Sequence, residues 1–258
     1  MYKHWIDTYT TSESFKPSIN VIMTTYFCNK KHYQSGSEHK SASCNDFKYI
    51  KPWYNSVKKL NLNGIIFHDG LSDEFLKKYE TSYIKFVYVN SQDYNYSLND
   101  LRFFVYLEHI HKNPDIQNIF MTDGNDVTVV KNPFKLNLNK LYVGNETGIT
   151  VNYILKHKKV GGMYKKISEQ ELSRLQKFST SPLLNAGIVG GNRNNIIKLL
   201  TIMTDYFKKD SCLKCNMNMG VLNQSVYNNF SNYFTGEPLH SVFFGYQNNR
   251  KDVYFIHK

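Results

Sequence analysis

Apolar runs of strand length alternate with helix-like segments through the first half of the chain. The runs are rich in β-branched residues and span 19–25, 64–70, 84–90 and 116–122. Each neighbouring pair is separated by a segment that carries helix-start signals. This alternation predicts an α/β fold, with a Rossmann-like open sheet that is mostly parallel and has helices on both faces.

Three helices can be placed between these runs. Pro52 fits the first turn of a helix that ends near residue 60. Ser72 precedes two acids and then two lysines in SDEFLKKYE, an order that complements the helix dipole. Ser97 begins the third helix, and Asn113, which precedes a proline, ends it.

The second half of the chain is patterned less regularly. Strand-like segments span 141–148, 183–192 and 253–258, and helix-like segments span 168–178, 194–209 and 219–230. The chain has 258 residues with no internal repeat and no clean linker. We therefore expect one domain, 1–258, in which the polar residues 1–18 form a loose N-terminal arm and 28–46 form a mobile loop.

Two carboxylates follow the fourth apolar run directly. Asp123 and Asp126 are separated by Gly124 and Asn125. Ligands of open α/β sheets bind beyond the carboxyl ends of the strands, where these acids are expected. Paired carboxylates can ligate Mg²⁺ or Mn²⁺, and Mn²⁺ also accepts an imidazole. The alternative is a tight turn, because Asp, Gly and Asn favour turns for local reasons.

The net charge of +11 predicts attraction to nucleic acid, membrane headgroups or nucleotide-type substrates. The lysines occur as scattered pairs, without a zinc-finger or helix-turn-helix signature, so we expect no nucleic-acid partner. No apolar stretch is long enough to span a membrane, and no export signal is visible. We expect a soluble cytoplasmic protein, in the host cytoplasm if the source is a virus.

The four cysteines suggest neither a zinc site nor a redox motif. Cys212 and Cys215 form a lone CxxC, and Cys28 and Cys44 are far away in sequence. We expect free thiols, with a disulfide as the second choice.

FMTDGNDVTVVKNPF, around Asp123, resembles the metal-binding segment of GT-A-fold glycosyltransferases. Its two-residue gap is closest to lysyl-hydroxylase-type glucosyl/galactosyltransferase domains, and less close to glycogenin-like transferases. Further segments resemble that family in the expected order: INVIMTTYF, SLNDLRFFVYLEHI, PLLNAGIVGG, VLNQSVYNNF and DVYFIHK.

The resemblance implies a role for particular residues. It implies that Mn²⁺, or Mg²⁺, is held by Asp123, Asp126 and His257, with His240 as the second choice for the histidine. It implies that the donor, a UDP-linked nucleotide sugar, is bound by Thr24, Thr25, Tyr26, Arg102, Asp123, Gly124 and Lys258. It implies that Asn185 and Gln224 face the transferred sugar and act in catalysis together with Asp123. Asp69 is a further candidate, for the base or ribose, with a turn cap as the alternative.

The function implied is transfer of a sugar from a UDP-hexose or UDP-pentose donor to a glycan or protein-linked acceptor. One departure stands out, because Asn223 replaces the Asp that often precedes Gln224. Either the base lies elsewhere, with Glu146, Asp205, Glu237 and Asp252 as the candidates for an inverting reaction, or no protein base is needed, as in a front-face retaining mechanism. Two alternatives remain: a catalytically inactive nucleotide- or glycan-binding module of the same fold, and a basic nucleic-acid-binding protein.

Overall fold

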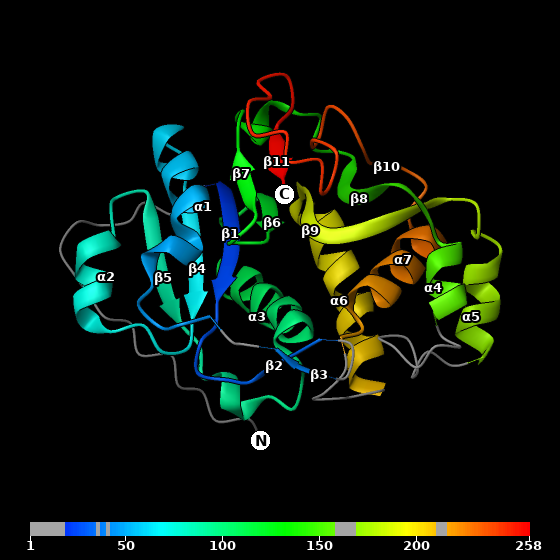
Figure 1. Cartoon of the computed structure of the whole chain (residues 1–258), viewed down its shortest axis with the longest axis horizontal. Helices are drawn as coiled ribbons and strands as arrows, with labels where there is room; N and C mark the ends of the chain where they lie inside the picture. Colours follow the sequence, from blue (N-terminus) through cyan, green and yellow to red (C-terminus); the bar gives the residue numbers. More distant parts are fainter. Residues whose placement is uncertain (1–18, 35–36, 40–41, 158–168, 210–215) are drawn as a thin grey trace.

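The computed structural model describes residues 19–34, 37–39, 42–157, 169–209 and 216–258 (Figure 1). The expected arm, 1–18, and the Cys212–Cys215 pair lie outside the described residues.

A seven-stranded sheet forms the centre of the fold, in the order β10-β8-β9-β6-β1-β4-β5. Its strands are β1 (Asn20–Tyr26), β4 (Gly64–His68), β5 (Ile84–Tyr88), β6 (Asn118–Thr122), β8 (Leu141–Thr150), β9 (Pro182–Asn192) and β10 (Tyr233–Phe234). Only β9 runs antiparallel to its neighbours, β6 and β8. The other four pairings are parallel, which confirms the predicted sheet.

Helices cover both faces of the sheet, as predicted (Figure 1). They are α1 (Phe47–Lys59), α2 (Asp73–Tyr79), α3 (Leu98–Lys112), α4 (Asn152–His157), α5 (Glu169–Gln176), α6 (Arg193–Lys209) and α7 (Asn218–Asn229). The alternation of β1 shows how the faces divide. Val21 and Met23 pack into the core formed with α3, α6 and α7, whereas Ile22 and Tyr26 pack into the core formed with α1 and α2.

The caps that set the helix boundaries match two of the three predicted starts. Ser72 and Ser97 each accept a hydrogen bond from a backbone N–H of the first turn of α2 and α3. The predicted start at Pro52 is wrong, because α1 begins at Phe47, capped by the Asp46 side chain. Pro52 lies within this helix, where its missing N–H removes the usual helical donor to the carbonyl of Lys48, an exposed residue.

A second, two-stranded sheet pairs the end of the described chain with its middle. The strand β11 (Phe255–His257) runs antiparallel to β7 (Val127–Val129), and His257 stands opposite Val127. Strand β7 begins directly after Asp126. This pairing therefore carries a residue from the last strand to the turn between β6 and β7.

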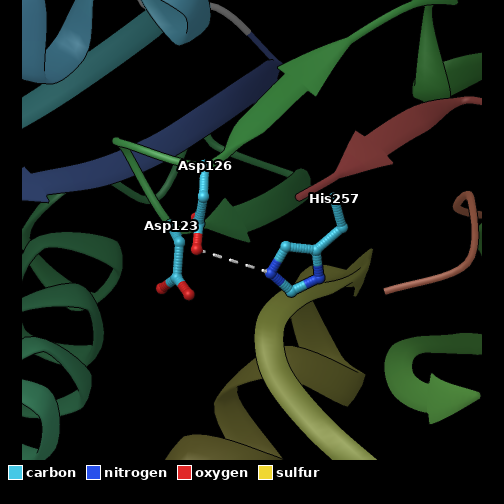
Figure 2. Close-up of side chains that lie close together, drawn as sticks. All are labelled: Asp123, Asp126 and His257. Carbon is cyan, nitrogen blue, oxygen red and sulfur yellow. Dashed lines mark ion pairs between the residues drawn. The ribbon is translucent and has the colours of Figure 1, made fainter. Parts of the chain in front are cut away.

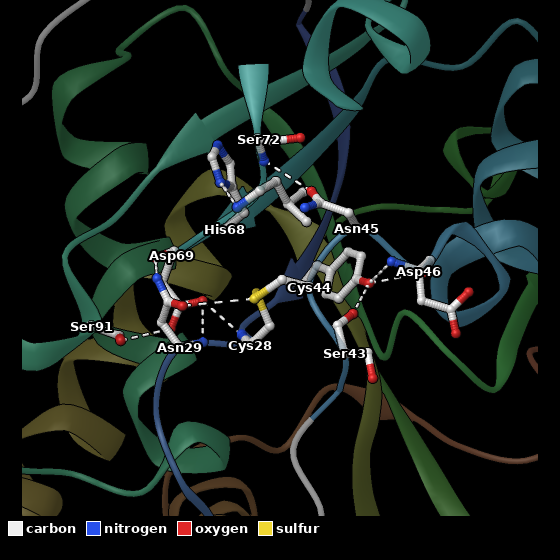
Figure 3. The surroundings of a disulfide bond; sticks show 12 residues. Cys28, Asn29, Ser43, Cys44, Asn45, Asp46, His68, Asp69, Ser72 and Ser91 are labelled. Atoms are coloured by element: carbon white, nitrogen blue, oxygen red, sulfur yellow. Dashed lines mark hydrogen bonds between the residues drawn. A yellow bond between two sulfur atoms is a disulfide. The ribbon is translucent and has the colours of Figure 1, made fainter. Parts of the chain in front are cut away.

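Two features of the segment after β1 differ from the expectation. A short hairpin, β2 (His32–Gln34) and β3 (Ser37–His39), interrupts the predicted loop. Cys28 and Cys44 form a disulfide (Figure 3), so the expectation of free thiols is wrong for this pair. Disulfides are rare in the cytosol, so this bond is at odds with the expected cytoplasmic location.

Among the described residues, no helix has the length and apolar character needed to cross a membrane.

The contact between β6 and β9 gives a stability test. Gly190 stands opposite Phe120, and a Cβ on Gly190 would lie 2.1 Å from a ring carbon of this fully buried side chain. We expect Gly190→Ala to lower the free energy of unfolding by about 2 kcal/mol, the size of an overpacked core substitution. Urea unfolding followed by circular dichroism measures it.

Gly144→Ala is the matched control for this substitution. Its Cβ would meet the Asn185 carbonyl oxygen at 3.2 Å, a milder contact than the one at Gly190. Equal unfolding midpoints for the two variants would contradict the packing described for Phe120.

Candidate functional site

Three potential metal ligands from separate parts of the chain converge at the carboxyl end of β6. Asp123, Asp126 and His257 each offer a ligand atom, and these atoms lie within 4.8 Å of one another (Figure 2). Asp123 follows β6, Asp126 precedes β7, and His257 is delivered by the β11–β7 pairing. The sequence prediction for these three residues therefore corresponds to a real cluster in space, here called the Asp-Asp-His cluster.

Backbone hydrogen bonds hold this cluster in place. The Asp123 N–H donates to the Gly187 carbonyl on β9 at 2.9 Å, and the Lys258 N–H donates to the Asp126 carbonyl at 3.0 Å. The two bonds anchor both ends of the Asp123–Asp126 turn, the first to the central sheet and the second to the chain after β11. The turn interpretation and the metal interpretation of this motif are thus compatible, since a tight turn presents both acids.

Gly187 leaves the space in which the cluster forms. A Cβ at this position would lie 2.4 Å from Cε1 of His257 and 2.9 Å from Oδ2 of Asp123. Gly124 is similarly constrained, because its Cβ would meet Thr24 Oγ1 at 2.9 Å and the Thr25 carbonyl at 3.3 Å. Gly124 therefore packs against the end of β1 and brings the turn up to that strand.

Electrostatics distinguish the two carboxylates. Although burial opposes ionisation, the Arg102 charge holds the pKa of Asp123 below its usual range, and Arg102 Nη1 donates to Asp123 Oδ1. Burial, followed by the negative charge of Asp123, raises the pKa of Asp126. Burial also lowers the pKa of His257 to about 4, so its imidazole is neutral and able to act as a ligand.

Unsatisfied atoms in the cluster fit a divalent cation. Asp126 Oδ1 is buried and has no hydrogen-bond partner among the described residues. His257 Nε2 faces Asp126 Oδ2 at 3.9 Å, which is too long for a hydrogen bond. Two carboxylates and one neutral imidazole form a donor set that suits Mn²⁺.

Arg102 is buried next to the cluster and does not point into solvent. Its side chain is buried, pairs with Asp123, and donates from Nη2 to the Ala186 carbonyl at 3.4 Å. Its Nε atom has no partner among the described residues. This buried cation offsets the repulsion between the two acids and sets the position of Asp123.

The predicted nucleotide residues at the end of β1 occupy different environments. Thr24 is fully buried, and its Oγ1 has no partner among the described residues. Tyr26 is also buried, and its hydroxyl donates to backbone carbonyls of Ser43 and Asp46. Its side chain is thus committed to the fold, which leaves its backbone for a ligand. Thr25, between them, is half-buried and next to Gly124.

Asp69 braces the segment that follows β1. Its Oδ1 accepts from the backbone N–H groups of Cys28 and Asn29 at 2.6 and 3.1 Å, and its Oδ2 accepts from Ser91 Oγ at 2.7 Å (Figure 3). Both carboxylate oxygens therefore already have protein donors. These contacts match the turn-cap alternative better than a direct contact with a base or ribose.

Asn185 is adjacent to the cluster through Gly187. Its Oδ1 accepts from the Gly187 N–H at 2.7 Å, and its Nδ2 donates to Glu146 Oε1 at 3.3 Å. The amide is therefore oriented, as expected for a polar side chain in an apolar strand. Burial raises the pKa of Glu146, whose side chain is only partly exposed.

The Asn223 departure has a structural explanation. Asn223 Oδ1 accepts from the Leu184 N–H, and Nδ2 donates to the Leu184 carbonyl, both at 2.9 Å. Only an amide can satisfy both groups, because a carboxylate cannot donate to the carbonyl. The neighbouring Gln224 is also buried, and its Nε2 donates to the Tyr206 hydroxyl at 3.0 Å.

The remaining candidates are separated from the cluster or already engaged. His240 is hydrogen-bonded at both ring nitrogens, through Nε2 to Asn145 and through Nδ1 to the Ser241 carbonyl, so the second choice for a metal ligand fails. Asp205 pairs with Lys208 on an exposed face of α6. Glu237 and Asp252 both pair with Arg250. Of the four proposed bases, Glu146 alone contacts Asn185.

Tyr49 is a site residue that sequence reasoning missed. Its ring stacks on Tyr26 at a centroid distance of 4.7 Å, and burial together with the charges of Asp123 and Asp126 raises its pKa. It comes from α1, whose early start the sequence did not reveal. The helical spacing of Ile50, Trp53 and Val57, which share one buried face, is the sequence pattern that indicates the earlier start of α1.

Comparisons with known proteins establish the fold. No protein-family model and no curated protein matches the sequence. The solved structure of galactosyltransferase LgtC, in complex with donor and acceptor sugar analogues, aligns with a TM-score of 0.51 at 12% identity, covering 92% of this chain and 86% of that chain.

A glycosyltransferase involved in glycosylation of the major capsid of PBCV-1 also aligns, with a TM-score of 0.46 at 12% identity and 92% coverage of both chains. At such identity the likeness to LgtC shows the fold alone. That fold is the predicted GT-A-type α/β sheet. The closer resemblance to lysyl-hydroxylase-type domains stays a prediction.

The raised pKa of Asp126 predicts how metal binding depends on pH. A protonated Asp126 must lose its proton to bind Mn²⁺, so affinity should increase as pH rises, by up to about tenfold per pH unit below its pKa. Calorimetry in two buffers of different ionisation enthalpy measures the affinity and the released proton. Asp205→Asn, at an exposed carboxylate, should behave as wild type. Affinity that is independent of pH would contradict this assignment of Asp126.

Proposed function

We propose that this protein is a metal-dependent glycosyltransferase that uses a nucleotide-diphosphate sugar, with UDP as the nucleotide. The observation that supports the proposal is the convergence of Asp123, Asp126 and His257 at the carboxyl edge of a GT-A-type sheet. This is the edge at which open α/β sheets bind ligands. The acceptor class is a glycan or a protein-linked sugar.

The cluster has the chemistry that this reaction needs. A diphosphate carries charge that must be neutralised before it can leave the sugar, and a divalent cation held by the cluster would supply that neutralisation. Arg102 positions Asp123 and compensates part of the acidic charge. Lys258, which follows the ligand His257 directly, is half-buried beside Asp126 and adds a positive charge near the expected phosphates.

Asn185 and Glu146 are proposed to face the transferred sugar. They lie next to the cluster through Gly187, and their mutual hydrogen bond orients both polar groups. Because burial raises the pKa of Glu146, this carboxylate is a better proton acceptor than an exposed one. We therefore assign Glu146 as the base if the transfer inverts the anomeric centre. Gln224 is buried and its amide is bonded to Tyr206, so it is assigned a structural role instead of a contact with the sugar.

An inactive nucleotide- or glycan-binding module is the second candidate function. Its sequence motivation was Asn223, whose bidentate contact with Leu184 gives that residue a structural reason instead. The nucleic-acid alternative rests on the net charge of +11 alone. The two alternatives differ from the proposal in turnover and in ligand, so binding and hydrolysis measurements separate all three.

Thermal unfolding with UDP and Mn²⁺ tests donor binding. We expect UDP to stabilise the protein strongly only when Mn²⁺ is present, by about 2.7 kcal/mol at 100 times its dissociation constant. Asp126→Asn should abolish this shift, and Asp205→Asn, the same chemical change on an exposed helix face, should retain it. A full UDP shift in Asp126→Asn would contradict the metal-diphosphate assignment.

Glu146→Gln tests the assigned base. The glutamine keeps the oxygen that accepts from Asn185 but cannot take a proton, so transfer or hydrolysis of a UDP-sugar should fall by about 100-fold or more. UDP binding should be unchanged. Asp205→Asn, in the exposed pair with Lys208 on α6, is the control. Undiminished turnover in Glu146→Gln would remove the base and favour a retaining reaction that needs none.

A further inference from the structure

The segment Ser241–Gln247 lies against the Asp-Asp-His cluster. The His257 N–H donates to Ser241 Oγ at 3.1 Å, and the Ser241 N–H donates to the Phe255 carbonyl at 2.9 Å. In Figure 1 this part of the chain is drawn in red next to β11. These bonds anchor the start of the segment to the strand that carries the metal-ligand histidine.

Three aromatic rings lead from the cluster toward the surface. The His257 ring lies 4.4 Å from the Phe243 ring, and the Phe243 ring lies 4.1 Å from the Phe244 ring, measured between centroids. Phe244 is 64% exposed, and Tyr246, two residues on, is 66% exposed. No other large hydrophobic side chain in the described ranges is as exposed as these two.

The backbone at both exposed aromatics is strained. Phe244 has φ of 57° and Tyr246 has φ of 46°, in the left-handed region that bulky side chains rarely adopt. The Gly245 N–H donates to the Val242 carbonyl at 3.0 Å, which places Phe244 third in a four-residue turn. With positive φ, that position favours Gly or Asn. Such a conformation is costly for a bulky side chain, and the burial of these exposed rings does not offset that cost.

The far end of the segment is also anchored. Arg250 donates to Gln247 Oε1 and to Glu237 at 2.9 Å, and it forms a two-pronged contact with Asp252. The segment is thus tied to β11 at one end and to an ion-pair network at the other. Phe244 and Tyr246 lie between these two anchors, on a loop that is fixed at both ends.

We propose that Phe244 and Tyr246 form an acceptor subsite, which stacks against the C–H face of a saccharide that receives the transferred sugar. The inference rests on the proposed function. A pyranose ring has an apolar face and a polar rim, and exposed aromatic rings with nearby polar groups are a surface that suits it. Two rings are far smaller than the surface of about 1,200 Å² that a stable protein interface buries, so a protein partner fits less well.

The position of the subsite explains why strain is retained there. Phe244 contacts Phe243, and Phe243 contacts the His257 imidazole that we assign to the metal. A saccharide stacked on Phe244 would therefore lie on the side of the protein that carries the cluster assigned to the donor diphosphate. A glycine at position 244 would relieve the backbone but remove the platform.

A glycan array tests the subsite. Wild type, Phe244→Gly, Tyr246→Ala and the control Tyr88→Ala, each with Mn²⁺ and UDP, would be applied to immobilised oligosaccharides. Tyr88 is an exposed aromatic at the far edge of the sheet, on β5. We expect wild type and Tyr88→Ala to bind the same glycans, and the other two variants to bind them roughly tenfold more weakly or worse.

Thermal unfolding of the same variants separates the subsite from a structural role. Phe244→Gly should melt at or above the wild-type temperature, because glycine tolerates positive φ, and it should keep its UDP and Mn²⁺ shift. Unchanged glycan binding by Phe244→Gly, loss of its UDP shift, or no glycan bound by wild type would each overturn the subsite. Absence of the UDP shift in wild type would instead overturn the proposed function, on which the subsite rests.

Discussion

The antiparallel pairing of β11 with β7 is the interaction on which the candidate site depends. It places His257 opposite Val127, and so beside Asp126, although 131 positions separate the histidine from that acid in the sequence. The central sheet supplies the other half, because Asp123 directly follows β6 and β9 contributes Gly187, whose missing Cβ leaves space for the imidazole. The cluster also needs a counter-charge, since two neighbouring acids repel one another. Buried Arg102, which lies on α3 and pairs with Asp123, provides this positive charge.

Much of the fold could be predicted from local patterns, and the reasons are visible in the structure. The parallel strands β1, β4 and β6 are short, largely buried and mostly apolar, and the caps Ser72 and Ser97 act within a few residues of themselves. The early start of α1 was missed because Pro52 resembles a helix start and Asp46 lies outside any apolar periodicity. The Cys28–Cys44 disulfide depends on where the chain returns after a hairpin, which spacing alone does not determine.

The site shows the same division between local and distant information. The Asp123–Asp126 turn is visible in the sequence, but the proposed metal site also needs His257 and the space at Gly187, and the fold brings these to the turn. Asn223 departs from the Asp that the family resemblance predicts. Its contacts explain the departure, because an amide satisfies both backbone groups of Leu184. Asp69 and Tyr26 illustrate the reverse, since side chains expected to meet a nucleotide already hold the protein together. At 12% identity, the likeness to LgtC shows the fold alone, so the proposed function rests on these contacts.

A crystal structure of the protein with Mn²⁺ and UDP, with anomalous data collected at the manganese edge, tests the central claim most directly. The account predicts one strong anomalous peak within coordination distance of Asp123, Asp126 and His257, with the diphosphate of UDP completing the coordination and the base toward the end of β1. A manganese peak bound elsewhere, or UDP bound away from these three side chains, would contradict it.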